Sequence, residues 1–166
     1  SVVSIQSAVA YGHAGNSSAV FALQRTGVEV WPVHTVNFSN HTGYGSWRGK
    51  AIPAEEVWDI VLGIDERGAL ENTDALLCGY LGTPEVGRVI LDAAELIRAG
   101  VQVTIFNQRS VAQIFEMLAQ VAATVGAADK GQALLLHYRV RLAQMNQAVQ
   151  AQIASGKRRP RVYFEE

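Results

Sequence analysis

The sequence predicts an α/β protein with a doubly wound, mostly parallel sheet of four or five strands and one long C-terminal helix. Two observations lead to this prediction. Short apolar or β-branched runs alternate with amphipathic stretches, and helix start and stop signals fall at the borders between them. Strands and helices that alternate in this way form parallel β-α units, with helices on both faces of the sheet.

Four runs have the length and composition of buried strands. They are residues 2–5, 28–33, 75–78 and 101–106, and a fifth run at 161–164 alternates as a half-buried strand does. The expected order of the strands is the flavodoxin-like 2-1-3-4-5, because this order needs the fewest unusual connections.

Between the strands, apolar side chains recur at spacings of three and four, as on one face of a helix. The three stripes are Val57, Ile60, Val61 and Ile64; Val86, Val89, Ile90, Ala93, Ala94 and Ile97; and Val111, Ile114, Phe115, Leu118, Ala122 and Val125. Thr83 and Ser110 are the expected N-caps, and Gly100 and Gly126 are the expected glycines that follow a helix end.

A longer helix is expected over about residues 128–155, a stretch without proline. Its apolar seam consists of Leu134, Tyr138, Leu142, Met145, Val149 and Ile153. Such a helix is roughly 35–40 Å long, which is more than a small sheet covers. The seam should be buried, since an exposed stripe of this length would be sticky. The helix either folds back over the sheet or packs against the same helix of a second copy, its one expected partner.

The composition is that of a globular protein with a single domain over residues 1–166. It is 49% hydrophobic and 17% charged, and the net charge of -1 gives no reason to expect nucleic acid or a membrane surface as partner. No apolar stretch reaches the ~20 residues that span a bilayer. The chain shows no signal peptide, so a cytoplasmic location is expected.

Spacing alone identifies no catalytic residue, no metal site and no cofactor site. His13, His34 and His41 lack the spacing of metal ligands, and Cys78 is expected to be a small buried apolar residue. Residues 11–17 follow the first strand and open a helix, which is where anions bind. Their glycine spacing fits neither the dinucleotide fingerprint nor the Walker A pattern, so a tight turn is the alternative.

Several longer motifs in the first part of the chain occur in a fixed order. They are Ser4-Ile5-Gln6-Ser7, Tyr11-Gly12-His13-Ala14-Gly15-Asn16-Ser17, Val30-Trp31-Pro32, Phe38-Ser39-Asn40-His41-Thr42-Gly43-Tyr44 and Cys78-Gly79-Tyr80-Leu81-Gly82. Over about residues 1–99 the chain resembles bacterial pyridoxal kinases of the ribokinase superfamily. The resemblance implies that Ser7 hydrogen-bonds the pyridine ring of pyridoxal and that Thr42 and Tyr80 line the same pocket.

The resemblance stops in the predicted fourth strand. The kinases have Asp-Pro-Val at the end of a corresponding strand and, further on, a Gly-x-Gly-Asp loop with the catalytic base. Here Asn107-Gln108 stands at the first place, and Gly-x-Gly-Asp does not occur in the sequence. Phosphoryl transfer depends on groups that position phosphates and stabilise charge. The expectation is therefore a protein without catalytic residues or a cofactor, and not an enzyme.

Residues from about 100 to 166 resemble a segment of helical-backbone periplasmic binding proteins, the family that captures cobalamin, haem or siderophores. The similarity lies in the run from Gly100 to Val103, the long helix, and the ending Pro160-Arg161-Val162-Tyr163-Phe164. Together the two resemblances predict an engineered chimera built by fragment recombination, without native biological activity. The alternatives are weak residual binding of pyridoxal and a module that oligomerises.

Overall fold

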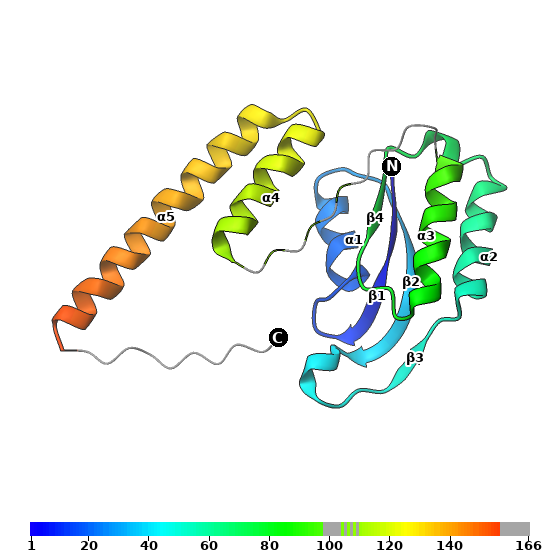
Figure 1. Ribbon diagram of the computed structural model, residues 1–166, viewed down its shortest axis with the longest axis horizontal. Helices are drawn as coiled ribbons and strands as arrows, with labels where there is room; N and C mark the ends of the chain where they lie inside the picture. Colours follow the sequence, from blue (N-terminus) through cyan, green and yellow to red (C-terminus); the bar gives the residue numbers. More distant parts are fainter. Residues whose placement is uncertain (98–103, 105, 107, 109, 157–166) are drawn as a thin grey trace. The chain divides into compact units, whose positions relative to one another are not determined.

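The computed structural model describes residues 1–97, 104, 106, 108 and 110–156 (Figure 1). These residues form two compact units: the first contains residues 1–97, and the second contains the described residues from 104 to 156. The prediction of a single domain over residues 1–166 stays a prediction. The strands predicted at 101–106 and 161–164 and the helix end at Gly100 lie outside the described residues, apart from Thr104 and Phe106.

The first unit is built on a four-stranded sheet with the order β3-β2-β1-β4. Its strands are β1 (Val2–Tyr11), β2 (Val30–Asn40), β3 (Gly49–Ala51) and β4 (Ala75–Cys78). β1 is parallel to both β2 and β4, and β3 pairs with β2 in the antiparallel direction. The predicted α/β class and mostly parallel sheet are therefore confirmed. β3 was not predicted, because three exposed residues give no pattern.

Helices cover both faces of this sheet, as a doubly wound fold requires (Figure 1). α1 (Asn16–Arg25) packs on one face, against β1 and β2. α2 (Ala54–Asp65) and α3 (Pro84–Ile97) lie side by side on the other face. Two short 3-10 helices, η1 (Thr42–Tyr44) and η2 (Leu70–Asn72), complete the connections.

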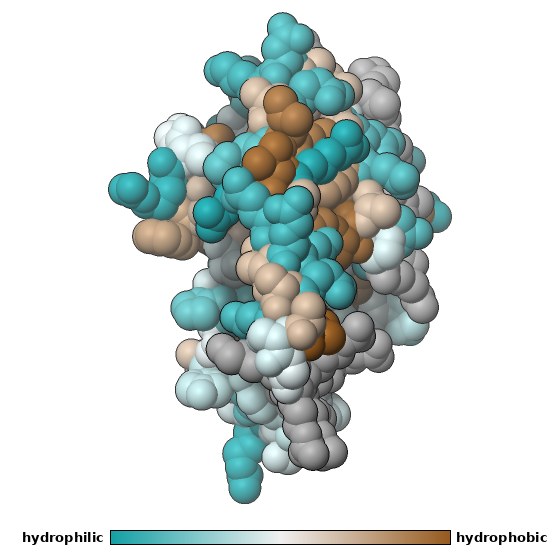
Figure 2. Space-filling view, turned by 90° about the vertical axis from the view of Figure 1, so that its left-hand side faces the viewer, coloured by the Kyte–Doolittle hydropathy of each residue, from teal (hydrophilic) through white to brown (hydrophobic). Residues whose placement is uncertain are grey.

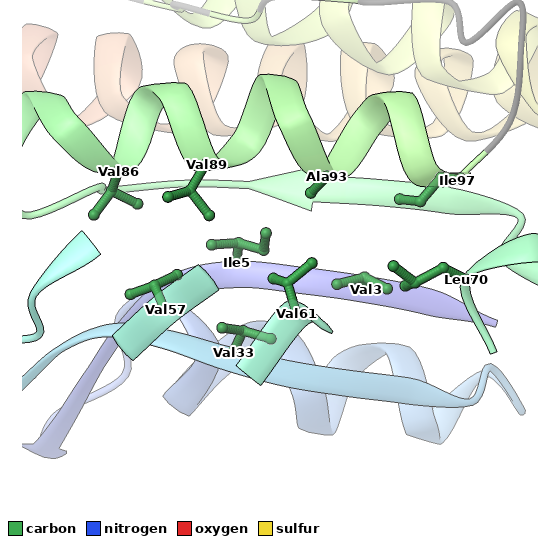
Figure 3. Packing of buried hydrophobic residues seen from close by; sticks show 10 residues of the cluster. All are labelled: Val3, Ile5, Val33, Val57, Val61, Leu70, Val86, Val89, Ala93 and Ile97. Carbon is green, nitrogen blue, oxygen red and sulfur yellow. The ribbon is translucent and has the colours of Figure 1, made fainter. Parts of the chain in front are cut away.

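The core lies between the sheet and the helices α2 and α3 (Figure 3). It joins apolar residues of the strands to the predicted helical stripes; its members are Val3, Ile5, Val33, Val57, Val61, Leu70, Val86, Val89, Ala93 and Ile97. Side chains alternate along β1, so Val3 and Ile5 enter this core, whereas Ser4 and Gln6 face α1. One face of the central strand is thus apolar and the other is polar.

The second unit is a hairpin of α4 (Val111–Thr124) and α5 (Ala128–Ala154). Ser110 caps α4 by accepting a hydrogen bond from the Gln113 N–H at 3.2 Å, as predicted. Gly126 has a φ of 69° in the turn between the helices, which suits its predicted place after a helix end. The long helix is confirmed, and it has 27 residues.

Within this unit the predicted α5 seam is largely exposed, and its burial by the sheet or by a second copy stays a prediction. Leu135 is buried, whereas its neighbour Leu134 is 43% exposed and Met145 is 61% exposed. The reason is that α4, with 14 residues, faces only part of α5. It packs on the side that carries Gly131 and Leu135. On the face that Figure 2 draws, apolar residues (brown) are exposed between hydrophilic residues (teal). None of the described helices is long and apolar enough to cross a membrane.

Candidate functional site

The order of the strands creates a place for a site at one end of the sheet. The chain runs from β1 outward to β2 on one side, and returns to β4 on the other side of β1. In open parallel sheets, ligands bind at the carboxyl ends of the strands where the order reverses in this way. The pairing of β1 with β4 ends at Ile5 and Cys78, where β4 itself ends, whereas β1 continues to Tyr11.

A cavity of about 210 Å³ lies at this end of the sheet. It is lined by Gln6, Ser7, Val9, Ala14, Gly15, Phe38, His41, Thr42 and Tyr80. The three residues that the resemblance assigned to a pyridoxal pocket, Ser7, Thr42 and Tyr80, therefore line one cavity, although they are far apart in the sequence. They come from β1, from η1 and from the loop after β4.

Ser7 occupies an irregularity in the sheet. Gln6 pairs with His34, but Ala8 pairs with Asn37, so two residues of β2 lie opposite Ser7 alone. Such bulges redirect side chains and are frequent beside active sites. Ser7 is 8% exposed. Its hydroxyl is thus held in a largely dry position at the base of the cavity.

Glycine closes the cavity above Ser7. Gly15 has φ 55° and ψ -134°, a conformation that costs glycine little and other residues much. It forms an isolated antiparallel bridge with Ala8. A Cβ at Gly15 would overlap with the carbonyl oxygen and Oγ of Ser7. The loop of residues 12–15 therefore lies on Ser7 at a distance that only glycine permits.

Hydrogen bonds that involve the main chain at or beside Thr42 and Tyr80 fix the positions of these two residues. His41 precedes η1, and its Nδ1 accepts a hydrogen bond from the Gly43 N–H at 3.0 Å, which orients the turn containing Thr42. The carbonyl oxygen of Tyr80 accepts a hydrogen bond from Thr35 Oγ1 at 2.7 Å. The Tyr80 side chain remains 57% exposed, so it forms an open side wall of the cavity.

Six further lining residues were not predicted, and Gln6, Phe38 and His41 have the largest side chains among them. Each lies next to or within a motif that carries the resemblance, so the motifs gave their location but not their orientation. His41 also lines a second hollow of about 280 Å³, together with Tyr11, His13 and Tyr44. The rings of Tyr11 and Tyr44 meet there edge to face, with centroids 6.1 Å apart.

The described titratable groups near the cavity form no metal site and provide no reactive thiol. In the part of the chain that the structure describes, no group of three His, Cys, Asp or Glu side chains is placed to hold a metal ion. Cys78 is exposed, where burial was expected, because it ends a short strand at the edge of the described sheet. Desolvation by the surrounding chain still raises the pKa of its thiol to about 11. The thiol is therefore protonated at neutral pH and a poor nucleophile.

The sequence is similar to curated pyridoxal kinases over 97 or 98 residues, although no family model matches it. Pyridoxal kinase PdxY of Leifsonia xyli is 60% identical over 59% of this chain and 35% of that protein. PdxY of Corynebacterium diphtheriae is 59% identical over 58% of this chain and 34% of its own length. This chain thus spans about a third of the length of these relatives.

The solved structures agree. Pyridoxal kinase from Leishmania donovani, in complex with ADP and ginkgotoxin, is 35% identical and superposes with a TM-score of 0.55. The match covers 57% of this chain and 33% of that chain. The α/β fold of the first unit is therefore that of pyridoxal kinases, with their similarity extending over somewhat more than half of the chain.

The prediction of an artificial chimera without biological activity is wrong. Sequence identity of 57–60% to pyridoxal kinases from three bacteria, over 97 or 98 residues, contradicts it. None of these comparisons supports a segment of a periplasmic binding protein in residues 100–166. The error came from weak motifs in that part of the chain, which were interpreted as a second resemblance beside the strong one in the first part.

Proposed function

We propose that the chain has a pyridoxal-kinase-type function and that its first unit binds pyridoxal in the cavity formed by Ser7, Thr42 and Tyr80. One observation carries the proposal: three residues from separate segments line a single cavity at the end of the sheet where ligands of this fold class bind. The identity of 59–60% to pyridoxal kinases over 97 or 98 residues supports it.

The lining suits a small polar aromatic ring. The hydroxyl groups of Ser7 and Thr42 offer hydrogen bonds to ring nitrogen and ring substituents. Phe38 and Tyr80 offer apolar surface to the ring faces. Binding sites combine apolar walls with a few placed polar groups in this way.

The strength of binding follows from the size of the cavity. Its 210 Å³ lies below the ~300–1,000 Å³ of most ligand pockets, and the Tyr80 side is open. Part of the ligand therefore stays in water. We expect a dissociation constant of the order of 1 mM, equivalent to about -4 kcal/mol.

Phosphoryl transfer needs further groups. In the relatives the reaction is that of a kinase, but residues 1–166 contain no Gly-x-Gly-Asp sequence to serve as the phosphate-binding loop. We therefore assign to this chain the pyridoxal-binding step of the reaction.

Titration with pyridoxal tests the assignment. Calorimetry or the absorbance of bound pyridoxal should show saturable binding, and Ser7→Ala should weaken it about tenfold by removing a buried hydrogen bond to the ring. Thr26→Ala is the matched control, because the Thr26 hydroxyl is exposed at the end of α1 and bonds only the Leu23 carbonyl at 2.7 Å. Absence of saturable binding, or equal affinity in both variants, would contradict the proposed function.

A further inference from the structure

We propose that Asn16 is a positioning residue for the cavity, one that fixes the loop of residues 12–15 above Ser7. This inference rests on the proposed function, because the cavity is the pyridoxal site in that proposal. Asn16 is the first residue of α1 and directly follows Gly15. It is only 3% exposed, whereas asparagine is mostly exposed in proteins. A buried amide must be satisfied by hydrogen bonds, and these tie it to the sheet.

The amide of Asn16 has hydrogen-bond partners at both its oxygen and its nitrogen. Its Oδ1 accepts a hydrogen bond from Ser4 Oγ at 2.7 Å. Its Nδ2 lies 3.0 Å from the Ser4 carbonyl oxygen and 3.1 Å from the Val33 carbonyl oxygen. The Gln6 carbonyl oxygen and His34 Nδ1 lie 3.4 and 3.1 Å from the same nitrogen.

These contacts require a donor at this place. An amide nitrogen carries two N–H groups, so the four acceptors exceed what it can fill. A side chain without an N–H or O–H group would leave the facing carbonyl oxygens of β1 and β2 without this hydrogen-bond donor. A carboxylate would add a further negative oxygen to this group. The site therefore selects asparagine over alanine and over aspartate.

The network of Asn16 reaches the cavity on two sides. Gln6 lines the cavity, and its Nε2 donates to Ser4 Oγ at 2.8 Å, which in turn donates to Asn16. On the other side, Gly15 is the main-chain neighbour of Asn16 and lies directly on Ser7. By holding the start of α1 to β1 and β2, the amide sets the separation between the glycine loop and Ser7 Oγ.

The experiment compares Asn16→Ala and Asn16→Asp with the core variant Val61→Ala in the full chain. Val61 is fully buried between α2 and the sheet, on the face opposite to Asn16, so its truncation lowers stability without touching the network. Two quantities are measured for each variant. One is the dissociation constant for pyridoxal, and the other is amide hydrogen exchange in peptides that cover residues 11–17.

Both Asn16 variants should raise the dissociation constant about tenfold or more, because small misplacements of binding groups have large effects, whereas Val61→Ala should change it less than about twofold. Exchange over residues 11–17 should accelerate only in the Asn16 variants. An Asn16→Asp protein that binds normally, or exchange that accelerates equally after Val61→Ala, would overturn the proposal. If the unmodified chain binds no pyridoxal, the proposed function fails, and the exchange measurement alone decides the role of Asn16.

Discussion

Replacing Gly15 by alanine tests whether the glycine loop and Ser7 form one rigid site. Two costs follow from the geometry. Alanine at a φ of 55° and a ψ of -134°, a region that is open almost only to glycine, pays about 1–3 kcal/mol. Its Cβ also overlaps with the Ser7 carbonyl oxygen and Oγ, and overpacking of this kind costs about 1–3 kcal/mol. Gly15→Ala should therefore lower the free energy of unfolding by about 2–6 kcal/mol, because the two costs add.

The matched control is Gly27→Ala. Gly27 has a φ of 81° after the end of α1, but a Cβ there would meet no atom within 4 Å. It therefore pays the conformational cost alone, about 1–2 kcal/mol. The larger loss expected for Gly15→Ala reports the overlap with Ser7 together with the glycine-only backbone conformation of Gly15.

Urea denaturation followed by tryptophan fluorescence measures both free energies, since Trp31 and Trp58 pack against the core. Pyridoxal titration adds a second readout: Gly15→Ala should abolish binding, because the displaced loop and Ser7 can no longer face the ring together, and Gly27→Ala should preserve it. Equal losses of stability in the two variants, with binding intact in both, would refute the close approach of Gly15 to Ser7.

Three other predictions concern the core, the start of α3 and the α5 seam. Ile5→Ala should cost about 2–4 kcal/mol in denaturation, because Ile5 is fully buried in the central strand; a loss under ~1 kcal/mol would contradict that packing. Hydrogen bonds from its own N–H and from the Thr83 side chain lower the pKa of Glu85. The stabilisation by Glu85 should thus be fully present above the usual carboxyl pKa and be lost as pH falls through the lowered pKa of the folded chain, so the melting temperatures of the original chain and Glu85→Gln should converge only in acid. Leu135→Ala should cost about 2–3 kcal/mol, and Met145→Ala under ~0.5 kcal/mol; similar losses would show that the seam is covered.

The fold was predictable where local pattern and burial coincide. The stripes over α2 and α3 supplied Val57, Val61, Val86 and Val89 to the core, because helix periodicity directly reports which face is apolar. Strand borders were less predictable. β1 continues to Tyr11, well past the predicted end at residue 5, since pairing with β2 sustains a strand through polar residues such as Gln6.

The α5 seam shows why the buried face of a helix is harder to predict than the helix itself. The spacing of Leu134 and Leu142 indicates an amphipathic helix, and the helix is present. Which side of it is buried depends on the neighbouring helix, and α4 packs on the side that carries Gly131 and Leu135. Leu134, Leu135 and Leu136 are all leucine and point in directions about 100° apart, so the sequence does not show which of them faces a neighbouring helix.

The residues of the site were found by motif, but their arrangement depends on contacts distant in sequence. Ser7 owes its position to a bulge against β2 and to the close approach of Gly15. Neither feature leaves a periodic signal, since a bulge arises from the pairing of two strands and a close approach from the absence of one atom. The same holds for Asn16, whose neighbours in the sequence suggest an ordinary helix start, whereas its hydrogen bonds reach Ser4 and Val33. The arrangement of such a site depends jointly on β1, β2 and the loop between β1 and α1. A substitution in any one of these segments should therefore displace the others and change the affinity for pyridoxal.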